Sequence, residues 1–143
     1  MRRTIPPPSR NRGTKIITTD LNELAEHLGA TITTHTGGEK GRYYGGGLIS
    51  LRDGLGPINR RCTLAHELAH HVLRHDPAAT GWWRARQERE ADRWASRLLI
   101  SPADYAAAEA MHGPHPGAIA HELGVTVRLV EVWKDAKTAG DPR

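Results

Sequence analysis

The chain has 143 residues, a formal net charge of +4 and a single cysteine, Cys62. This length supports one hydrophobic core, a lone cysteine excludes an internal disulfide, and no run of about eighteen apolar residues is present that could span a membrane. Five of the twenty basic residues precede the first acidic residue, Asp20, which leaves fifteen basic against sixteen acidic residues. The body of the chain is therefore close to neutral, and we expect no dedicated nucleic-acid-binding surface.

The N-terminal segment, residues 1–18, is expected to be a disordered arm. It contains five basic side chains and the run Pro6-Pro7-Pro8, and it lacks apolar periodicity. It does not resemble a secretion signal, because prolines occupy the positions where an apolar segment would be needed. We therefore expect the protein to be cytoplasmic.

Four short elements are predicted before residue 55. Asp20 is a helix-capping residue type and Gly29 a helix-ending one, which predicts a helix over 21–28. Alternating, β-branched or apolar residues separated by glycine-rich turns predict three strands, over 30–36, 42–44 and 48–51. We expect these strands to form a small antiparallel sheet.

A longer helix is predicted to begin at Pro57, because proline suits the first turn and apolar residues of helical spacing follow. It contains the run His66-Glu67-Leu68-Ala69-His70, an H-E-x-x-H motif. Two histidines four residues apart project from the same face of a helix. Their imidazoles can meet on one Zn²⁺, with Glu67 beside the open coordination position as general base.

A catalytic zinc usually has three protein ligands, so a third must lie elsewhere in the chain. Asp76 is at the spacing that one class of zinc proteases uses, but that class needs a glycine where this chain has Leu73. His71 points away from the face of the two motif histidines. His75 falls near the end of the helix, where a cation is favoured by the helix dipole. We expect both to be structural or exposed.

The favoured third ligand is Glu88, on a second helix predicted over 84–99. Asp92 is four residues further on and shares its face, an arrangement found in thermolysin-like zinc proteases. Asp92 would accept a hydrogen bond from a ligand histidine and fix its tautomer. Glu90 is the alternative ligand, but it lies about 200° around the helix from Glu88, so both cannot point at one ion.

The strand region is expected to serve the same site. In zinc proteases of this general type an edge strand beside the active-site helix pairs with the substrate backbone, and Gly46–Leu51 is the candidate edge. Tyr43 or Tyr44 could donate a hydrogen bond to an oxyanion, although packing is the favoured role for each.

The last third of the chain is predicted to be helical, over 102–111, 116–123 and 127–137. The final two helices flank Gly124-Val125-Thr126 and form a pair of helix-turn-helix type. Such a pair can read DNA, but the basic residues here are offset by nearby acidic ones. We favour a role in packing or in docking a partner.

Two blocks of sequence resemble the ImmA/IrrE-type metallopeptidases. The first is 61–73, RCTLAHELAHHVL, and the second is 88–95, EREADRWA, followed by LLISP at 98–102. The family has an R-[FC]-T-L-A-H-E-L-x-H helix, then E-x-E-A-[ND]-x-[FW]-A, then a short aliphatic run ending in proline. By this resemblance His66, His70 and Glu88 bind zinc, and Glu67 is the catalytic acid/base.

Together these features predict an α+β, mostly helical zincin-like domain. Its core would span residues 19–110, with the three-stranded antiparallel sheet packed beside the active-site helix. The C-terminal pair, 111–138, would pack on that core. The expected cofactor is Zn²⁺, although a His/His/Glu ligand set also accepts manganese or iron.

The resemblance implies a zinc endopeptidase with a regulatory role. Members of the family typically cleave or inactivate a helix-turn-helix repressor of a mobile element, a prophage or a stress response, so we expect a protein substrate of that kind and no membrane partner. The alternative is a metal-dependent anti-repressor that acts by binding its partner without proteolysis.

Overall fold

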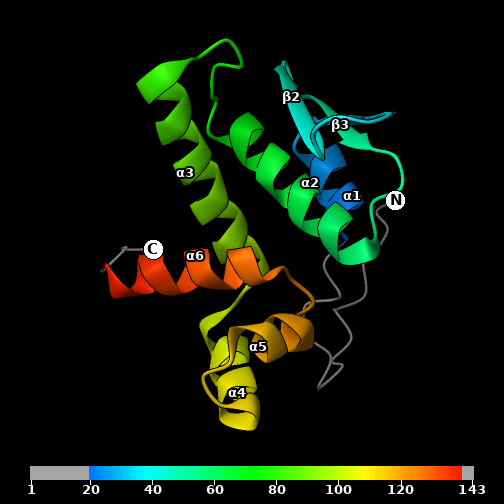
Figure 1. Cartoon of the computed structure of the whole chain (residues 1–143). Coiled ribbons are helices and arrows are strands. Elements are labelled where there is room, and N and C mark those ends of the chain that lie inside the picture. The colour runs from blue at the N-terminus through cyan, green and yellow to red at the C-terminus, as the bar shows by residue number, and fades with distance from the viewer. Residues whose placement is uncertain (1–19, 140–143) are drawn as a thin grey trace, which may run out of the picture.

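The computed structural model describes residues 20–139, so the predicted arm at 1–18 lies outside the described residues. The described part is mostly helical, with six helices and one three-stranded sheet (Figure 1). In chain order the elements are α1 (Leu21–His27), β1 (Thr31–His35), β2 (Gly41–Gly45), β3 (Leu48–Arg52), α2 (Pro57–Val72), α3 (Gly81–Leu99), α4 (Pro102–His112), α5 (Pro116–Leu123) and α6 (Val127–Thr138). All of the predicted helices and strands are present. No helix in residues 20–139 combines the length and the apolar character that a membrane crossing requires.

Local signals set the helix boundaries. The Asp20 carboxylate accepts hydrogen bonds from two backbone N–H groups in the first turn of α1, which confirms its predicted capping role. Pro57, Pro102 and Pro116 each occupy the first turn of a helix, where a missing N–H costs nothing. Gly124 ends α5 in the left-handed conformation that glycine adopts without strain.

The sheet is mixed, and the predicted antiparallel sheet is wrong in one of its two pairings. The strand order is β1-β3-β2, with β2 and β3 antiparallel but β1 and β3 parallel. The chain reverses direction twice, between β1 and β2 and again between β2 and β3. Because two reversals restore the original direction and β3 inserts between the other strands, β1 and β3 must run parallel.

The predicted substrate-binding edge is also wrong. β3, which the segment Gly46–Leu51 mostly supplies, is the central strand and pairs on both sides. Its residues Ile49, Ser50 and Leu51 are buried, as expected for the most apolar of the three strands. The sheet edge beside α2 is instead β2, which packs on that helix.

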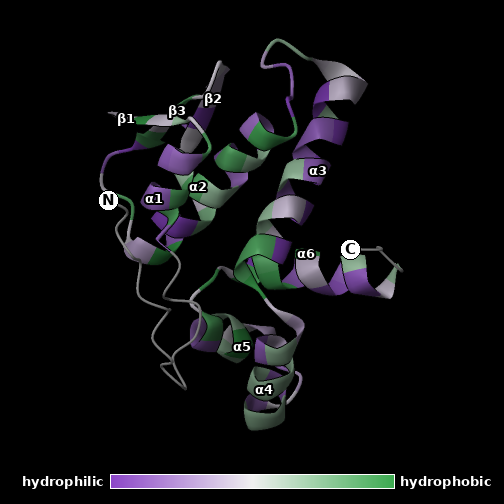
Figure 2. Ribbon diagram, turned by 180° about the vertical axis from the view of Figure 1, so that it is seen from behind, coloured by the Kyte–Doolittle hydropathy of each residue, from purple (hydrophilic) through white to green (hydrophobic). Residues whose placement is uncertain are grey.

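The hydrophobic core extends from α1 through β3 and α2 to α6. One face of α2, with Leu64 and Leu68 fully buried, packs into it. Hydrophobic colour is concentrated where the C-terminal end of α3 meets the start of α6, whereas much of the N-terminal half of α3 is hydrophilic (Figure 2). The buried residues of α3 all lie in its second half, from Ala91 onward. The first half of α3 therefore contributes no buried residue to the core.

Candidate metal centre

Helices α2 and α3 pack together and bring three candidate ligands to one point. One ligand atom each from His66, His70 and Glu88 lies within 4.8 Å of the others. The Nε2 atoms of His66 and His70 are 3.2 Å apart, and they lie 3.0 and 3.2 Å from the two Glu88 carboxylate oxygens. The set joins the two motif histidines to the glutamate predicted from the second helix.

Small side chains allow this approach of the two helices. Ala65 and Ala69 on α2, and Ala91 and Ala95 on α3, have no exposed surface. The distance between packed helices depends on the side chains at their contact, and alanine permits a short one.

The tautomer of His66 follows from its partner Asp92. His66 Nδ1 lies 2.9 Å from Asp92 Oδ1. Burial alone would raise the pKa of Asp92, but the hydrogen bond from His66 and the charge of Arg128 hold it below its usual value. An ionised carboxylate can only accept, so Nδ1 of neutral His66 carries the proton and Nε2 presents a lone pair.

A second chain of hydrogen bonds sets the tautomer of His70. His75 Nε2 lies 2.9 Å from Glu90 Oε1, and that hydrogen bond lowers the pKa of Glu90. His75 therefore donates through Nε2, and its Nδ1 accepts from His70 Nδ1 at 2.9 Å. With the proton on Nδ1, the Nε2 atom of His70 also presents a lone pair. The ring of Tyr43, stacked at 5.9 Å between centroids, covers one side of His70.

The donor set fits a divalent cation. Two neutral imidazole nitrogens and one carboxylate all direct lone pairs at the same point. This arrangement is unfavourable unless a positive charge lies between them. Tetrahedral Zn²⁺ with bonds of about 2.0–2.1 Å has ligand atoms about 3.3 Å apart, close to the spacing found here. Without an ion, a proton takes its place. Although burial disfavours the charged ring, hydrogen bonds to Asp92 and Glu88 raise the pKa of His66 to about 10.

Glu67 lies beside this group without belonging to it. Its side chain is buried, and burial raises its pKa to about 7 against the opposing charges of His66 and Arg84. Strand β2 passes directly over it: a Cβ added to Gly41 would lie 2.6 Å from Thr63 Cγ2 and 2.7 Å from Glu67 Oε2. Only glycine fits at this position without a shift, so the edge strand is held against the carboxylate.

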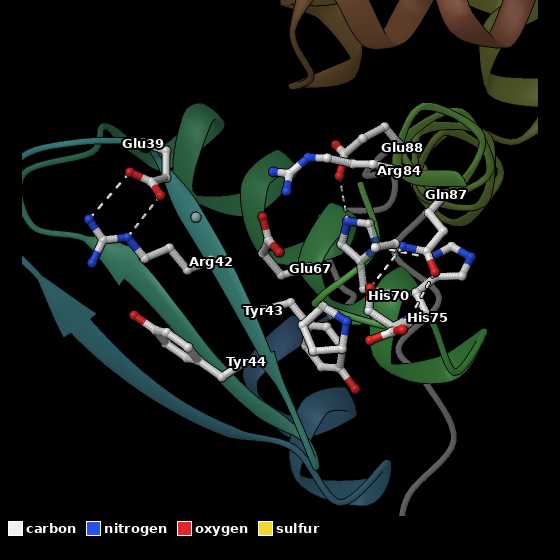
Figure 3. Close-up of a pocket in the computed structure, with 14 residues that line it drawn as sticks. Glu39, Arg42, Tyr43, Tyr44, Glu67, His70, His75, Arg84, Gln87 and Glu88 are labelled. Atoms are coloured by element: carbon white, nitrogen blue, oxygen red, sulfur yellow. Dashed lines mark hydrogen bonds and ion pairs between the residues drawn. The ribbon is translucent and has the colours of Figure 1, made fainter. Parts of the chain in front are cut away.

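A cleft opens over Glu67 and Glu88, between β2 and the first half of α3 (Figure 3). One half extends past Tyr43 to the loop after α2, at His75 and Pro77. The other half extends along α2 toward α6, where Thr63, Asp92 and Arg128 line it. Gly41, Glu67 and Glu88 line both halves, so the group of ligands lies midway along one groove.

His71, Asp76 and Glu90 lie outside the three-residue group. His71 Nε2 is 2.7 Å from the carbonyl oxygen of Leu28, a structural contact. Asp76 accepts a hydrogen bond from the Ala78 N–H at 2.9 Å and stabilises the turn after α2. Glu90 contacts His75 and Arg86 and is not part of the three-residue group.

Sequence analysis missed two contacts in this site. His75 was expected to be exposed or merely structural, but it is buried and hydrogen-bonds a candidate ligand. The chain turns back there because Arg74 adopts a positive φ of 58°, which helical spacing cannot anticipate. The other contact is Arg128 of α6, which donates to the second oxygen of Asp92. An isolated arginine 36 residues from its partner has no local sequence signal.

Comparison with known proteins identifies the family. The model of the IrrE N-terminal-like domain, Peptidase_M78, matches residues 13–132. No curated protein matches the chain. The family match covers most of the sequence and includes both helices of the candidate centre, and the match agrees with the resemblance of the two sequence blocks. The chain belongs to the IrrE N-terminal-like family of metallopeptidases.

Proposed function

We propose that this protein is a zinc-dependent endopeptidase in which His66, His70 and Glu88 hold the ion. Glu67 is then the catalytic acid/base, and Asp92 orients His66. The observation that carries the proposal is the convergence of two imidazole nitrogens and a carboxylate beside a buried carboxyl group. In the neutral tautomers that Asp92 and His75 favour, the Nε2 atoms of both histidines present lone pairs to the same point. A purely structural ion pair would not require this.

An ion held by His66, His70 and Glu88 would supply Lewis acidity, which polarises a peptide carbonyl and makes a water more acidic. Glu67 accepts the proton of the attacking water and later gives it to the leaving nitrogen. A pKa raised to about 7 by burial suits a group that must both take and return a proton near neutral pH. The stacked ring of Tyr43 and the hydrogen bond that His70 donates to His75 hold the His70 ring in place while this happens.

The substrate lies in the groove as an extended segment beside β2. This strand is an edge of the sheet, so its outer backbone groups are free to pair with a peptide. Gly41 holds the same strand against Glu67, which places a paired peptide next to the acid/base. A groove of this kind accepts unfolded chain and excludes helices, so cleavage is expected in linkers and exposed loops.

The regulatory role is proposed from the family resemblance. The substrate would be a helix-turn-helix repressor of a mobile element, prophage or stress response, cleaved in an interdomain linker in the cytoplasm. The alternative, a metal-dependent anti-repressor, differs in one respect that can be tested: it inactivates the repressor without breaking a bond.

The test compares wild type with Glu67→Gln on a purified repressor encoded by a neighbouring gene. The amide has nearly the shape of the carboxylate but cannot take a proton, so we expect equal zinc content and loss of cleavage by mass spectrometry. Equal cleavage by Glu67→Gln would contradict the mechanism. Release of the repressor from its operator by Glu67→Gln, with no cleavage by either protein, would instead support the binding alternative.

A further inference from the structure

We propose that Arg84 stabilises the negative charge that develops on the substrate carbonyl oxygen during cleavage. This inference rests on the peptidase function proposed above. Charge that appears on an oxygen in the transition state is stabilised by donors already aimed at it, and a cationic donor is especially effective.

The position of Arg84 places it in the reaction cleft. It precedes Glu88 by one helical turn on α3, so the two share a face. It lines the same half of the groove as Glu67, His70 and Glu88. In Figure 3 its guanidinium extends from α3 past the Glu88 carboxylate toward the side of the cleft where Glu67 lies. Its charge acts on Glu67, whose pKa it lowers against the effect of burial.

The guanidinium of Arg84 is available to a ligand. Within residues 20–139, no side chain forms a hydrogen bond or ion pair with it. The other arginine lining this half of the groove, Arg42, is paired with Glu39 at 3.1 Å. A cation that lies beside Glu88 on α3, with Glu67 on the other side of the cleft, and that pairs with neither carboxylate is available to a ligand that enters there.

Three other side-chain donors in this half of the groove, Gln87, Tyr43 and Tyr44, are committed or turned away. The Gln87 amide is bonded on both sides to the backbone of Asp76, at 2.7 and 3.1 Å. Tyr44, suggested by the sequence as an oxyanion donor, lies beside Arg42 and away from Glu67 in Figure 3. Tyr43, the other suggestion, stacks on His70, and its hydroxyl points away from Glu67 in Figure 3.

The chemistry defines when Arg84 acts. As the water oxygen bonds to the carbonyl carbon, the π pair of the C=O bond moves onto the carbonyl oxygen and the water proton goes to Glu67. When the C–N bond breaks, its electron pair and that proton go to the nitrogen, and the C=O bond re-forms. Arg84 donates hydrogen bonds to the oxygen while it is charged and transfers no proton itself, because its pKa is too high.

The test uses full-length, zinc-loaded wild type with the variants Arg84→Ala, Arg84→Lys and Arg89→Ala. Arg89 is a matched control, since it is exposed on the same helix and is absent from the cleft lining. The probes are a peptide selected from a mixed library by wild-type cleavage and its phosphinic analogue, in which a tetrahedral, charged phosphinate replaces the scissile amide.

We expect Arg84→Ala to keep its zinc, to lose about 10²-fold in kcat, and to bind the phosphinic analogue weaker by a similar factor. KM should change less than about threefold, as should binding of the uncleaved peptide measured in a Glu67→Gln background. Arg84→Lys should recover part of both losses, and Arg89→Ala should match wild type.

Two results would overturn the inference while leaving the proposed function intact. One is an Arg84→Ala enzyme with wild-type kcat and wild-type affinity for the phosphinic analogue. The other is an equal loss of affinity for the uncleaved peptide, which would make Arg84 a ground-state binding residue. Failure of zinc-loaded wild type to cleave any library peptide would overturn the proposed function itself, and this inference with it.

Discussion

Arg128 donates a hydrogen bond to Asp92, the carboxylate whose other oxygen accepts a hydrogen bond from His66 at 2.9 Å. This contact links α6, near the C-terminus, to a candidate metal ligand on α2 through a side chain of α3. The C-terminal helices therefore do more than complete the core, because one of their side chains fixes the orientation of a histidine at the centre.

The link predicts that substitutions on α6 alter metal affinity. Asp92→Ala should weaken zinc binding 10- to 100-fold, since it frees the His66 ring to rotate and to change tautomer. Arg128→Ala should weaken it less, because the hydrogen bond between His66 and Asp92 remains. Competition with a chromogenic chelator measures both. Lys134→Ala, which removes a charge elsewhere on α6, is the control, and an Arg128→Ala protein indistinguishable from it would refute the link.

The histidine chain predicts a comparable effect at His70. His75→Ala should lower zinc affinity by 10- to 100-fold, because His70 loses the acceptor that keeps the proton on its Nδ1. Glu90→Gln should act in the same direction but more weakly. His71→Ala is a close control, since His71 bonds a backbone oxygen instead of a ligand. If His71→Ala and His75→Ala bind zinc equally well, the tautomer argument is wrong.

The tight passage of β2 over Glu67 predicts a selective loss of activity in Gly41→Ala. The new methyl group meets Thr63 and Glu67, so the carboxylate must move while the three candidate ligands stay in place. We expect near-normal zinc content and a fall in kcat of about 10²-fold, the cost of a displacement of about 1 Å in a reacting group. Gly117→Ala, where the added methyl meets open space, is the control. Wild-type kcat in Gly41→Ala would show that Glu67 is free to adjust or has no part in catalysis.

The pKa of His66 predicts a pH dependence for metal binding. In the metal-free protein this pKa is raised to about 10, so at pH 7 a proton occupies the site. Zinc must displace it, so about one proton should be released per ion bound and the affinity should rise about tenfold per pH unit between pH 7 and 9. Calorimetry in buffers of different ionisation enthalpy counts the proton. Binding at pH 7 without proton release would contradict the assignment.

Much of the fold follows from local signals. Asp20, Pro57, Pro102 and Gly124 are residue types whose preferred positions mark helix ends, and the helices begin or end at them. The order of the strands has no such signal. Two chain reversals give a parallel pair only if β3 lies next to β1, and in this sheet β3, the most buried of the three strands, lies between the other two.

The same distinction applies to the candidate centre. His66 with His70, and Glu88 with Asp92, are pairs four residues apart on single helices, so geometry alone places each pair on one face. Helical spacing could not predict the position of His75, because this residue follows the end of α2 and comes directly after Arg74, which has a positive φ. The contact of Arg128 with Asp92, and the lack of a partner for the Arg84 guanidinium among the described side chains, depend on how α3 packs between α2 and α6. Only the folded chain specifies that packing.

The measurement that tests the central claim most directly is the zinc content of wild type, Glu88→Ala and Glu90→Ala after equilibration in micromolar zinc. If His66, His70 and Glu88 hold the ion, wild type and Glu90→Ala bind one equivalent, and Glu88→Ala binds much less. A Glu88→Ala protein that retains a full equivalent, or a wild type that binds none, would contradict the account.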